Sequence, residues 1–479
     1  MASVPVASGC APADTRHHRP ASHYAAHLKL ALPVMFSQMG HLIVQLTDSL
    51  MLGHYDTTAL AASAFGQSVF VIGLVFGVGF TLAMTPLVGA ARGANDVGAA
   101  AQWFSHGLAV NVAVALLITF VLLALYPWLD AFGQTPEVTA TARPYYLLLT
   151  ASLLPVMVFQ TFRQFTEGLG NTRLAALITV LEVLLNVGLN YLLIFGHGSF
   201  PRLGIVGAGV ATLLVRMVLA GTFALCFIRL RMFAPYRAAL RRTPWDGAAI
   251  RRYLRLGLPL GGQFVLEVGA FAAGAVMMGW LGKLELAAHQ IAIGLASLTF
   301  MGASGIAAAA TIRVSHYLGA GERRAMRAAG LAAVHIVMAY MGLTALVFVA
   351  LRHWLPTLFT TDPAVVGIAA TLLLVAAVFQ LFDGLQVVLL SALRAMTDAL
   401  LPTVLAFIAY LLVALPTSYG LAFWLGWREV GIWMGYVVGL ATAAVMFFLR
   451  FHALSCVPFR SKDEAQPPTP ADSPKRRAT

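Results

Sequence analysis

The segment LALPVMFSQMGHLIVQLTDSLMLG, residues 30–53, is followed 226 positions later by a related segment, LGLPLGGQFVLEVGAFAAGAVMMG, residues 256–279. Without a gap, the same offset aligns Leu60-Ala61-Ala62 with Leu286-Ala287-Ala288 and Gly93 with Gly319. The two halves of the chain are therefore copies of one unit. In a chain this apolar, paired halves are typical of a secondary transporter, whose substrate site lies where the repeats meet.

The composition of the chain places it in a lipid bilayer. Of its 479 residues, 59% are hydrophobic and only 10% are charged, whereas a soluble domain carries about 25% charged residues. Windows of about 20 apolar residues, long enough to cross a hydrocarbon core of about 30 Å, recur along the chain. There are six in each half, at residues 28–52, 61–88, 103–125, 145–165, 174–195 and 206–227, and at residues 256–281, 287–310, 328–351, 366–390, 401–425 and 432–449.

These windows predict an all-α integral membrane protein with twelve transmembrane helices in two pseudo-symmetric six-helix lobes. The predicted segments are a disordered N-terminal tail at 1–27, a first lobe at 28–228, a linker at 229–255, a second lobe at 256–452 and a disordered C-terminal tail at 453–479. The C-terminal tail is assigned as disordered because it is rich in Pro, Lys and Arg. The N-terminal tail is polar and has no apolar stretch, so a cleaved signal peptide is not expected.

The net charge of +12 is explained by the predicted topology and does not indicate a surface that binds nucleic acid. Because the number of spans is even, both tails lie on one side, and the loops and tails of that side hold 24 Lys and Arg against five in the opposite loops. Basic loops stay in the cytoplasm. We therefore expect cytoplasmic termini, cytoplasmic tails and a cytoplasmic linker, and no nucleic-acid partner.

Motifs for other chemistries are absent from the sequence. Cys10, Cys226 and Cys456 form no spaced pair, so neither a disulfide nor a metal cluster is expected. No G-x-x-x-x-G-K-[ST] phosphate loop occurs, and no nucleophile and base stand at usable spacing. We expect no enzyme activity and no cofactor, and energy that comes from an ion gradient or from a partner.

Polar side chains recur at helical spacing inside four spans. Their separations of three or four residues place them on one face of each helix. These stripes are Gln38, His41, Gln45 and Asp48 in the first span, Glu182, Asn186 and Asn190 in the fifth, Gln263 and Glu267 in the seventh, and Gln380, Asp383 and Gln386 in the tenth. Such stripes face the bundle interior or a wet cavity, and the amides among them commonly serve only to bond neighbouring helices.

The acids in the stripes are the first functional candidates, because a carboxylate near the bilayer centre costs at least about 2.5 kcal/mol. Glu267 has apolar residues on both sides, and Asp383 follows a phenylalanine, so either carboxyl group can carry a proton. Together with the oxygens of Gln380 and Gln386, they are also candidate ligands of sodium, a hard cation that prefers oxygen. Asp48, near the outer end of its helix, is expected to be better hydrated.

The fifth span brings a second set of polar residues towards the first. Asp48 and His41 of the first span and Glu182, Asn186 and Asn190 of the fifth are expected to form one polar pocket. Two acids that meet without a cation repel each other, so one of them holds a proton or the pair binds a cation. The alternative is that Glu182 pairs with His41 or Arg216 as a structural contact only.

Two pairs of opposite charge lie four residues apart at the inner ends of spans. These are Arg163 with Glu167 and Arg394 with Asp398. Residues at this spacing are neighbours on a helix surface. We predict a structural ion pair in each case.

Six motifs in order resemble the multidrug and toxic compound extrusion (MATE) transporters, particularly their NorM-like bacterial branch. The resemblance covers the chain from about residue 30 to residue 449. The motifs are TDSLMLGH from Thr47, FRQFTEG from Phe162, LNVGLNYLLIFG from Leu185, FVLEV from Phe264, AAHQIA from Ala287 and QLFDGLQ from Gln380.

This resemblance implies two six-helix lobes around a central cleft, in a monomeric protein of the bacterial inner membrane. It also implies alternating-access antiport of bulky, often cationic organic compounds and drugs against Na+ or H+. Family cation-site roles carry over to Glu267, Asp383 and Asp48, with Asn186 and Asn190 beside Asp48. Glu182 and His41 depart from the family pattern, which leaves the coupling ion open.

Two rival functions remain at this point. A passive channel is disfavoured by the repeat and by the absence of a filter-like loop. A flippase for lipid-linked precursors requires a strongly basic cleft, whereas only Arg163 and Arg216 are expected inside the spans, against four acids.

Overall fold

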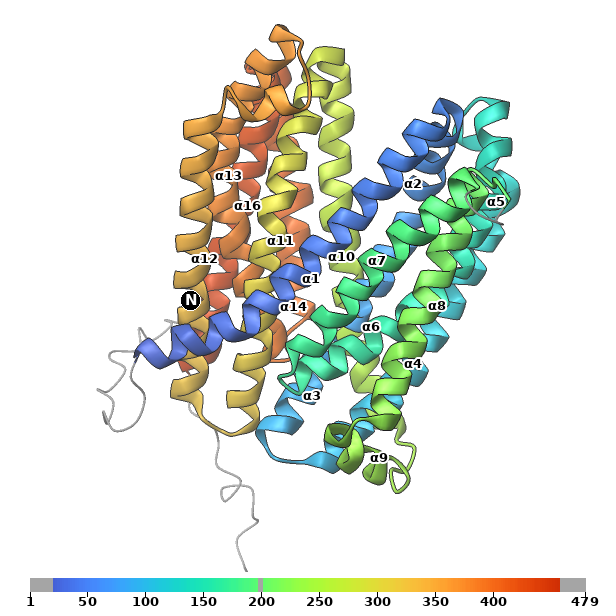
Figure 1. Ribbon diagram of the computed structural model, residues 1–479. Helices are drawn as coiled ribbons and strands as arrows, with labels where there is room; N and C mark the ends of the chain where they lie inside the picture. Colours follow the sequence, from blue (N-terminus) through green and yellow to red (C-terminus); the bar gives the residue numbers. More distant parts are fainter. Residues whose placement is uncertain (1–19, 197–200, 457–479) are drawn as a thin grey trace, which may run out of the picture.

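The computed structural model describes residues 20–196 and 201–456, so the tails predicted at 1–27 and 453–479 lie mostly outside the described residues. Within these ranges twelve helical segments are long and apolar enough to cross a membrane. The predicted fold class is confirmed: an all-helical protein with two groups of six spans. Figure 1 shows these groups side by side, with α12, α13 and α16 in one and α4, α5 and α8 in the other.

The first six spans are built from eight α-helices and one 3₁₀ turn. They are α1 (Pro20–Tyr55), α2 (Thr57–Thr81), α3 (Met84–Gly93), α4 (Val97–Leu125), η1 (Tyr126–Phe132), α5 (Pro136–Ala151), α6 (Leu153–Gly168), α7 (Thr172–Phe195) and α8 (Ile205–Arg229). Asp56, Asp96 and Asn171 cap α2, α4 and α7, each accepting the backbone N–H three residues on.

The second and fourth spans are each divided into two helices. The second consists of α2 and α3, and the fourth of α5 and α6. Pro86 and Pro155 lie just after the breaks and have no N–H to bond the carbonyls of Leu82 and Ala151. Proline in a helix interior removes this bond and interrupts the helix.

The linker and the last six spans follow. They are η2 (Arg231–Phe233), α9 (Ala234–Leu240), α10 (Gly247–Leu281), α11 (Lys283–Gly319), α12 (Arg323–Leu351), η3 (Leu355–Leu358), α13 (Pro363–Ala395), α14 (Leu400–Phe407), η4 (Ile408–Ala414), α15 (Leu415–Tyr419), η5 (Gly420–Trp424) and α16 (Arg428–Cys456). The eleventh span contains the π-helical segments η4 and η5, a geometry often found at functional sites.

Two helices begin earlier than their apolar windows indicate. α1 begins at Pro20 rather than near residue 28, and α10 begins at Gly247 rather than at 256. Residues 20–27 and 247–255 are therefore helical instead of belonging to a tail and a linker. A hydropathy window detects only the stretch that matches the hydrocarbon core, and a helix can continue beyond it.

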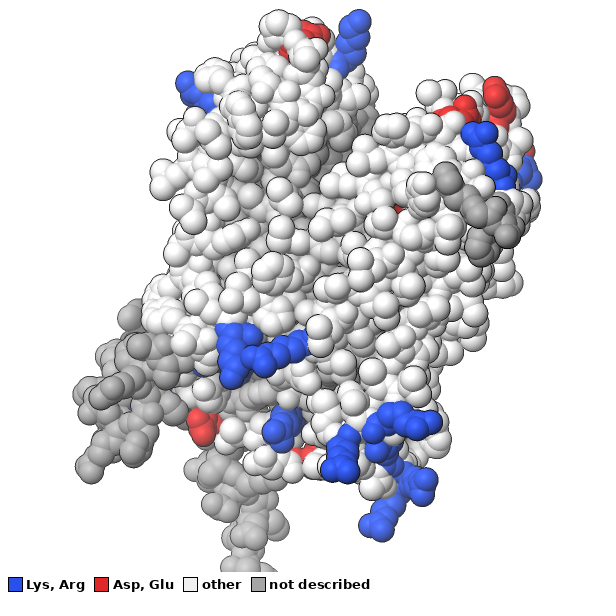
Figure 2. All heavy atoms as spheres, in the orientation of Figure 1, with Lys and Arg blue, Asp and Glu red and all other residues white. Residues whose placement is uncertain are grey.

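The molecule has a basic end and a hollowed end. Figure 2 shows Lys and Arg gathered at one end, near the loops that carry α9 and the start of α1. At the opposite end the two groups of helices diverge in Figure 1, and the surface in Figure 2 is notched between them. We call these the basic end and the open end.

Helix α1 contacts both lobes. His27 Nε2 donates to the Ile306 carbonyl of α11 at 2.9 Å, and Gln38 Nε2 donates to Ser304 Oγ of α11 at 2.8 Å. On its other side, Ser37 Oγ lies 2.7 Å from Thr179 Oγ1 of α7. The first helix of the first lobe therefore forms part of the boundary between the lobes.

Two equivalent glycines allow α3 and α11 to cross in direct contact at the basic end. A Cβ on Gly93 would meet the backbone of His316, and a Cβ on Gly319 would meet the backbone of Ala90. Both Gly93 and Gly319, and Ala90 and His316, are related by the 226-residue offset, so the crossing is pseudo-symmetric. His316 Nε2 also donates to the Gly168 carbonyl at 2.7 Å. Small residues that let backbones approach are typical of packed membrane helices.

Gly93→Ala is expected to destabilise this crossing, because the added methyl group collides with backbone that cannot move as a side chain can. Overpacking of this kind typically costs about 1–3 kcal/mol. We expect a lower midpoint of thermal unfolding for the purified protein in detergent. Gly342→Ala is the matched control, since Gly342 also lies in a membrane helix and a Cβ there meets nothing within 4 Å. Equal midpoints for the two variants would contradict the close crossing.

Candidate functional site

The first lobe encloses a polar cavity of about 500 Å³ beside α1, α2, α7 and α8. It is lined by the predicted residues His41, Gln45, Asp48 and Glu182, together with Tyr145, Gln160 and Arg216 among others. We call it the first-lobe cavity. The stripes of the first and fifth spans thus do meet.

Asp48 is held by the amides of α7. Asn190 Nδ2 donates to Asp48 Oδ1 at 2.5 Å and lies 3.2 Å from Asn186 Oδ1. Asn186 and Asn190 are one helical turn apart, so both reach the same carboxylate region. The Asn190 Oδ1 atom is buried without a hydrogen-bond partner among the described residues.

Glu182 contacts His41 across the cavity wall. The Glu182 Oε2 and His41 Nδ1 atoms lie 3.2 Å apart. Arg216 lines the same cavity and donates to Ser152 Oγ at 2.6 Å. Glu182 therefore contacts His41, one of the two partners that the structural alternative predicted for it.

Arg163 connects this cavity to the boundary between the lobes. Its Nε donates to Glu167 Oε1 at 2.9 Å, which confirms the predicted ion pair. Its Nη2 donates to Gln38 Oε1 at 3.0 Å, and its Nη1 lies 2.8 Å from His41 Nε2. Arginine has only donors, so His41 Nε2 must accept and the proton of a neutral His41 sits on Nδ1, facing Glu182. The contacts form a chain from Glu182 through His41, Arg163 and Gln38 to Ser304 of the second lobe.

The second predicted ion pair is wrong. Asp398 pairs with Arg450 at 2.8 Å, and the Arg394 guanidinium lies 5.2 Å from the ring centre of Phe264. Helix α13 ends at Ala395, and Thr397 has a left-handed φ of 59°. The chain therefore leaves the helix before Asp398, and the spacing rule for neighbours on one helix face does not apply.

The acids of the second lobe lie between α10, α13 and η4. Gln386 Nε2 donates to Asp383 Oδ1 at 3.4 Å, and Tyr410 OH donates to Gln386 Oε1 at 3.0 Å. Glu267 on α10 acts electrostatically on Asp383 and on Tyr410. Glu267 and Tyr410 also line a space of about 10 Å³, room for about one water molecule.

Two other predicted residues do not join these acids. Gln380 Oε1 accepts from Thr299 Oγ1 at 3.0 Å and from Thr344 Oγ1 at 3.2 Å. Gln263 is fully buried, and its amide atoms have no hydrogen-bond partner among the described residues. In their place stands Tyr410, which spacing rules could not find because a single tyrosine in a span forms no pattern.

A second cavity of about 250 Å³ lies between the lobes, and we call it the inter-lobe cavity. Its polar lining includes Gln38, Thr85, Gln160, Arg163, Gln164, Glu167, Ser304, Thr311, Ser391 and Arg394. Arg394, expected at the inner end of a span, is 7% exposed. The lining therefore has two arginines and one carboxylate, and the four acids of the spans lie elsewhere. The prediction that acids outnumber arginines in the interior is therefore wrong for this cavity.

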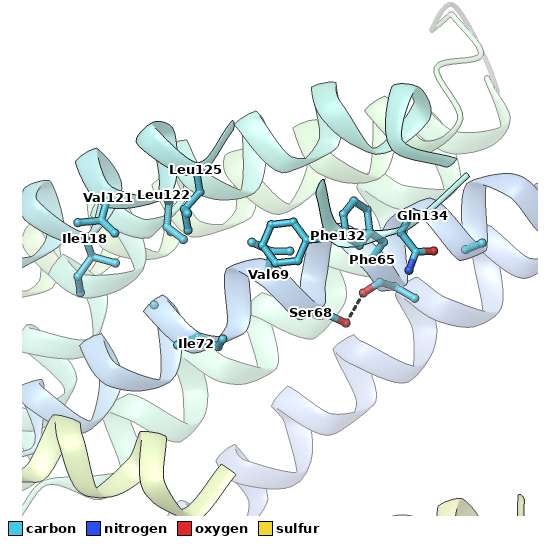
Figure 3. A pocket seen from close by; sticks show the side chains of 13 residues that line it. Phe65, Ser68, Val69, Ile72, Ile118, Val121, Leu122, Leu125, Phe132 and Gln134 are labelled. Atoms are coloured by element: carbon cyan, nitrogen blue, oxygen red, sulfur yellow. Dashed lines mark hydrogen bonds between the residues drawn. The ribbon is translucent and has the colours of Figure 1, made fainter. Parts of the chain in front are cut away.

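An apolar groove of about 600 Å³ lies on the first lobe. Figure 3 shows Val69 and Ile72 on one wall and Ile118, Val121 and Leu122 on the other, with Gln134 near one end. Among the described residues, no charged side chain lines it. Ile72 and Val121 are about half exposed, as expected for a surface that contacts lipid.

Comparisons with known proteins agree with this architecture. The MatE family model matches residues 33–192 and 259–419, two stretches that start at the 226-residue offset. The chain is 38% identical to a probable multidrug resistance protein NorM of Pseudomonas putida, over 91% of this chain and 95% of that protein. It is 35% identical to a probable multidrug resistance protein NorM of Pseudomonas aeruginosa, over 89% of this chain and 88% of that protein.

Solved structures share the fold at lower identity. A crystal structure of MATE in the straight conformation matches with a TM-score of 0.84 and 21% identity, over 90% of this chain and 96% of that one. An outward-facing multidrug resistance MATE family transporter of the MOP superfamily matches with a TM-score of 0.82 at the same identity and coverage. From the two-lobed architecture, the family match in both halves and the identity to its relatives, the chain belongs to the MatE family as a NorM-like multidrug efflux transporter.

Proposed function

We propose that this multi-pass protein of the bacterial inner membrane exports bulky, often cationic organic compounds by antiport, with alternating access between its two lobes. One observation carries the proposal: each lobe holds its own cluster of membrane-embedded acids, and a hollow separates the lobes at one end. Ionisable groups inside spans mark ion pathways, and paired repeats favour alternating access.

The orientation follows from charge. The basic end carries most of the Lys and Arg in Figure 2, so it is assigned to the cytoplasm and the open end to the outside. In this state the cleft releases substrate outward. The crossing of α3 with α11 closes the cytoplasmic end and separates when the lobes open inward.

Protons suit the acids better than sodium does. A sodium site needs several free oxygens. Gln380 Oε1 already accepts two hydrogen bonds and Gln386 Oε1 accepts one, while Asp48 receives an N–H from Asn190. Proton coupling requires only a carboxyl group that titrates.

The chain of contacts through His41 supplies a coupling step. A proton on His41 Nε2 would face the Arg163 guanidinium, and the like charges repel. Arg163 then releases Gln38, whose amide holds Ser304 of the second lobe. Proton arrival in the first-lobe cavity thereby weakens a contact between the lobes and favours their rearrangement.

Transport by the purified protein in vesicles tests the function. Imposed proton and sodium gradients are compared for their ability to drive a cationic dye against its own gradient. Uphill dye movement driven by a proton gradient supports proton antiport. Uphill dye movement driven only by a sodium gradient would mean that sodium is the coupling ion. Downhill movement alone would indicate a passive channel, and transbilayer movement of a lipid-linked probe without dye transport would indicate a flippase.

Glu267→Gln is expected to abolish gradient-driven uphill efflux while leaving dye binding intact, because the amide keeps the shape and cannot release a proton. The loss in driven rate is expected to be about tenfold or more, the scale of a typical coupling free energy. Asp383→Asn should give a similar loss, since both acids share one site. Gln263→Leu, on the same helix as Glu267, is the control. A normal rate of uphill efflux in Glu267→Gln would mean that Glu267 is not part of the coupling site.

A further inference from the structure

The linker between the two lobes carries a dense run of positive charge. Eight arginines lie between residues 229 and 255, against one acid, Asp246. Figure 2 shows Lys and Arg gathered at the basic end, where Figure 1 places helix α9 of this linker. One of the eight, Arg237, is used inside the linker, because it donates to the carbonyls of Phe227 at 2.5 Å and Leu230 at 2.9 Å.

The other seven arginines of the linker are not neutralised by the protein. All seven are exposed, and none of them forms an ion pair within residues 20–196 and 201–456. The Asp246 carboxylate is occupied elsewhere, since its Oδ1 accepts the Ala248 N–H at 2.8 Å and caps α10. A basic loop on one side of a membrane protein is an ordinary result of topology. The charge alone therefore does not identify a binding site.

A hollow of about 550 Å³ beside these arginines supplies the second observation. It lies where α9 packs against the beginning of α4, and Gln102, Arg242 and Thr243 line it together with small residues such as Gly98. Among the described residues, no acceptor binds the side-chain N–H groups of Gln102 or Arg242. Arginine binds phosphate oxygens through paired N–H donors. The hollow thus offers free donors of the kind that a phosphate group requires.

Tryptophans place this hollow at the surface of the membrane. Trp103 stands at the start of the third span, and the Arg252 guanidinium lies 5.6 Å from the centre of its ring. Trp245 is 68% exposed, and its ring centre lies 5.0 Å from that of His106 on α4. Met232 of the linker is 40% exposed. Tryptophan is enriched where a membrane meets water, and exposed apolar side chains among basic ones are typical of a segment that lies in the headgroup layer.

We propose that the linker and the start of α4 form a binding site for the headgroup of an anionic phospholipid, with Arg242 and Gln102 donating to its phosphate and Trp245 beside its acyl chains. Basic pockets beside membrane helices bind anionic headgroups. A membrane lipid supplies both the charge and the apolar chain, whereas a nucleic acid or a free phosphate supplies only the charge. The site is independent of the transported substrate and of the coupling ion.

Quenching of tryptophan fluorescence by brominated lipids tests the site in the purified full-length protein, in micelles of a non-ionic detergent. The probes are phosphatidylglycerol and phosphatidylcholine with the same brominated acyl chains, which differ only in the headgroup. We expect phosphatidylglycerol to quench at a lower mole fraction, and this preference to be lost in Trp245→Phe, which removes the reporter at the site. Arg242→Gln should lower the preference about fivefold, the scale of one basic residue at an anionic membrane surface. Arg242→Lys keeps the charge and should keep most of the preference.

Arg92→Gln is the matched control for the loss of one positive charge. Arg92 is also an exposed arginine at the basic end, but it lies on α3 and outside the hollow, so this variant should prefer phosphatidylglycerol as the wild type does. Equal quenching of the wild type by the two lipids would overturn the proposal. An equal loss in Arg92→Gln and Arg242→Gln would also overturn it, because the preference would then come from the charge of the whole basic end.

Competition distinguishes the lipid from other phosphates. Soluble dihexanoyl phosphatidylglycerol should restore the fluorescence at a lower concentration than inorganic phosphate or a short RNA does, at equal ionic strength. If inorganic phosphate or the RNA competes as well as the soluble lipid, the lipid assignment is wrong, in favour of a free phosphate or a nucleic acid. A normal elution profile of Arg242→Gln establishes that the variant is folded, as expected for an exposed side chain.

Discussion

Arg163→Met is expected to cost about 3–5 kcal/mol of folding free energy, the scale observed when one partner of a buried ion pair is removed. Arg163 and Glu167 are 5% and 3% exposed, so the variant leaves a carboxylate without a cation inside the protein. It also removes the donors to His41 and Gln38. Chemical unfolding of the purified protein in mixed micelles measures the loss.

Two companion variants make this result specific. Arg163→Met combined with Glu167→Leu should recover most of the stability, because apolar residues of similar volume often replace a buried pair at little cost. Arg450→Met breaks the more exposed pair with Asp398 and should cost only about 0–1 kcal/mol. An unfolding transition in Arg163→Met at the wild-type denaturant concentration would mean that the buried pair contributes nothing to stability.

Hydropathy and the internal repeat were sufficient to predict the fold class, because both are visible in the sequence without knowledge of which helices pack together. Twelve apolar windows correspond to twelve spans, and the repeat predicted the equivalence of Gly93 and Gly319, which the crossing of α3 and α11 displays. The breaks before Pro86 and Pro155 were harder to predict, since proline is ordinary in membrane helices and only some prolines divide a span.

The contacts at the boundary between the lobes were harder to predict from the sequence. The start of α1 looks polar, yet His23 and His27 are buried against α11. Arg313 of α11 donates to the His23 carbonyl at 2.7 Å, and His27 donates to Ile306. These partners are almost 300 residues apart in the chain, so no local pattern indicates that the segment is helical and packed.

The same distinction explains which site contacts could be predicted. Spacing rules found Arg163 with Glu167 and Asn186 with Asn190, because each pair lies within one helix. They failed for Arg394, where the helix ends one residue later. The contact of His41 with Arg163 was not expected at all, since the two residues lie on different helices and only packing brings them together.

This contact gives His41 a role that its counterpart in the repeat does not have. Position 41 corresponds to Glu267, so one half of the repeat places a base where the other places an acid. His41 then contacts Glu182 on one side and Arg163 on the other. The two lobes therefore place different ionisable groups at equivalent positions, although they share one architecture.

Asp48→Asn is expected to lower proton-driven uphill efflux by about tenfold or more, on the scale of a typical coupling free energy. The amide cannot release a proton, although Asn190 can still bond its oxygen. Glu182→Gln should lower the driven rate as well, because His41 loses the carboxylate beside its Nδ1. Efflux into vesicles over a series of imposed pH gradients measures both, with Gln45→Leu as a control that lines the same cavity without a titrating group.

The paired result distinguishes a coupled pocket from a structural contact. If Asp48 and Glu182 act on one proton, the double variant should be no slower than the worse single variant, since groups that act as a unit are not additive. If Glu182 only holds His41 in place, Glu182→Gln should lower stability and leave the pH dependence of efflux unmoved. Full proton-driven activity in Asp48→Asn would exclude the first-lobe cavity from coupling and leave Glu267 and Asp383 to carry the proton alone.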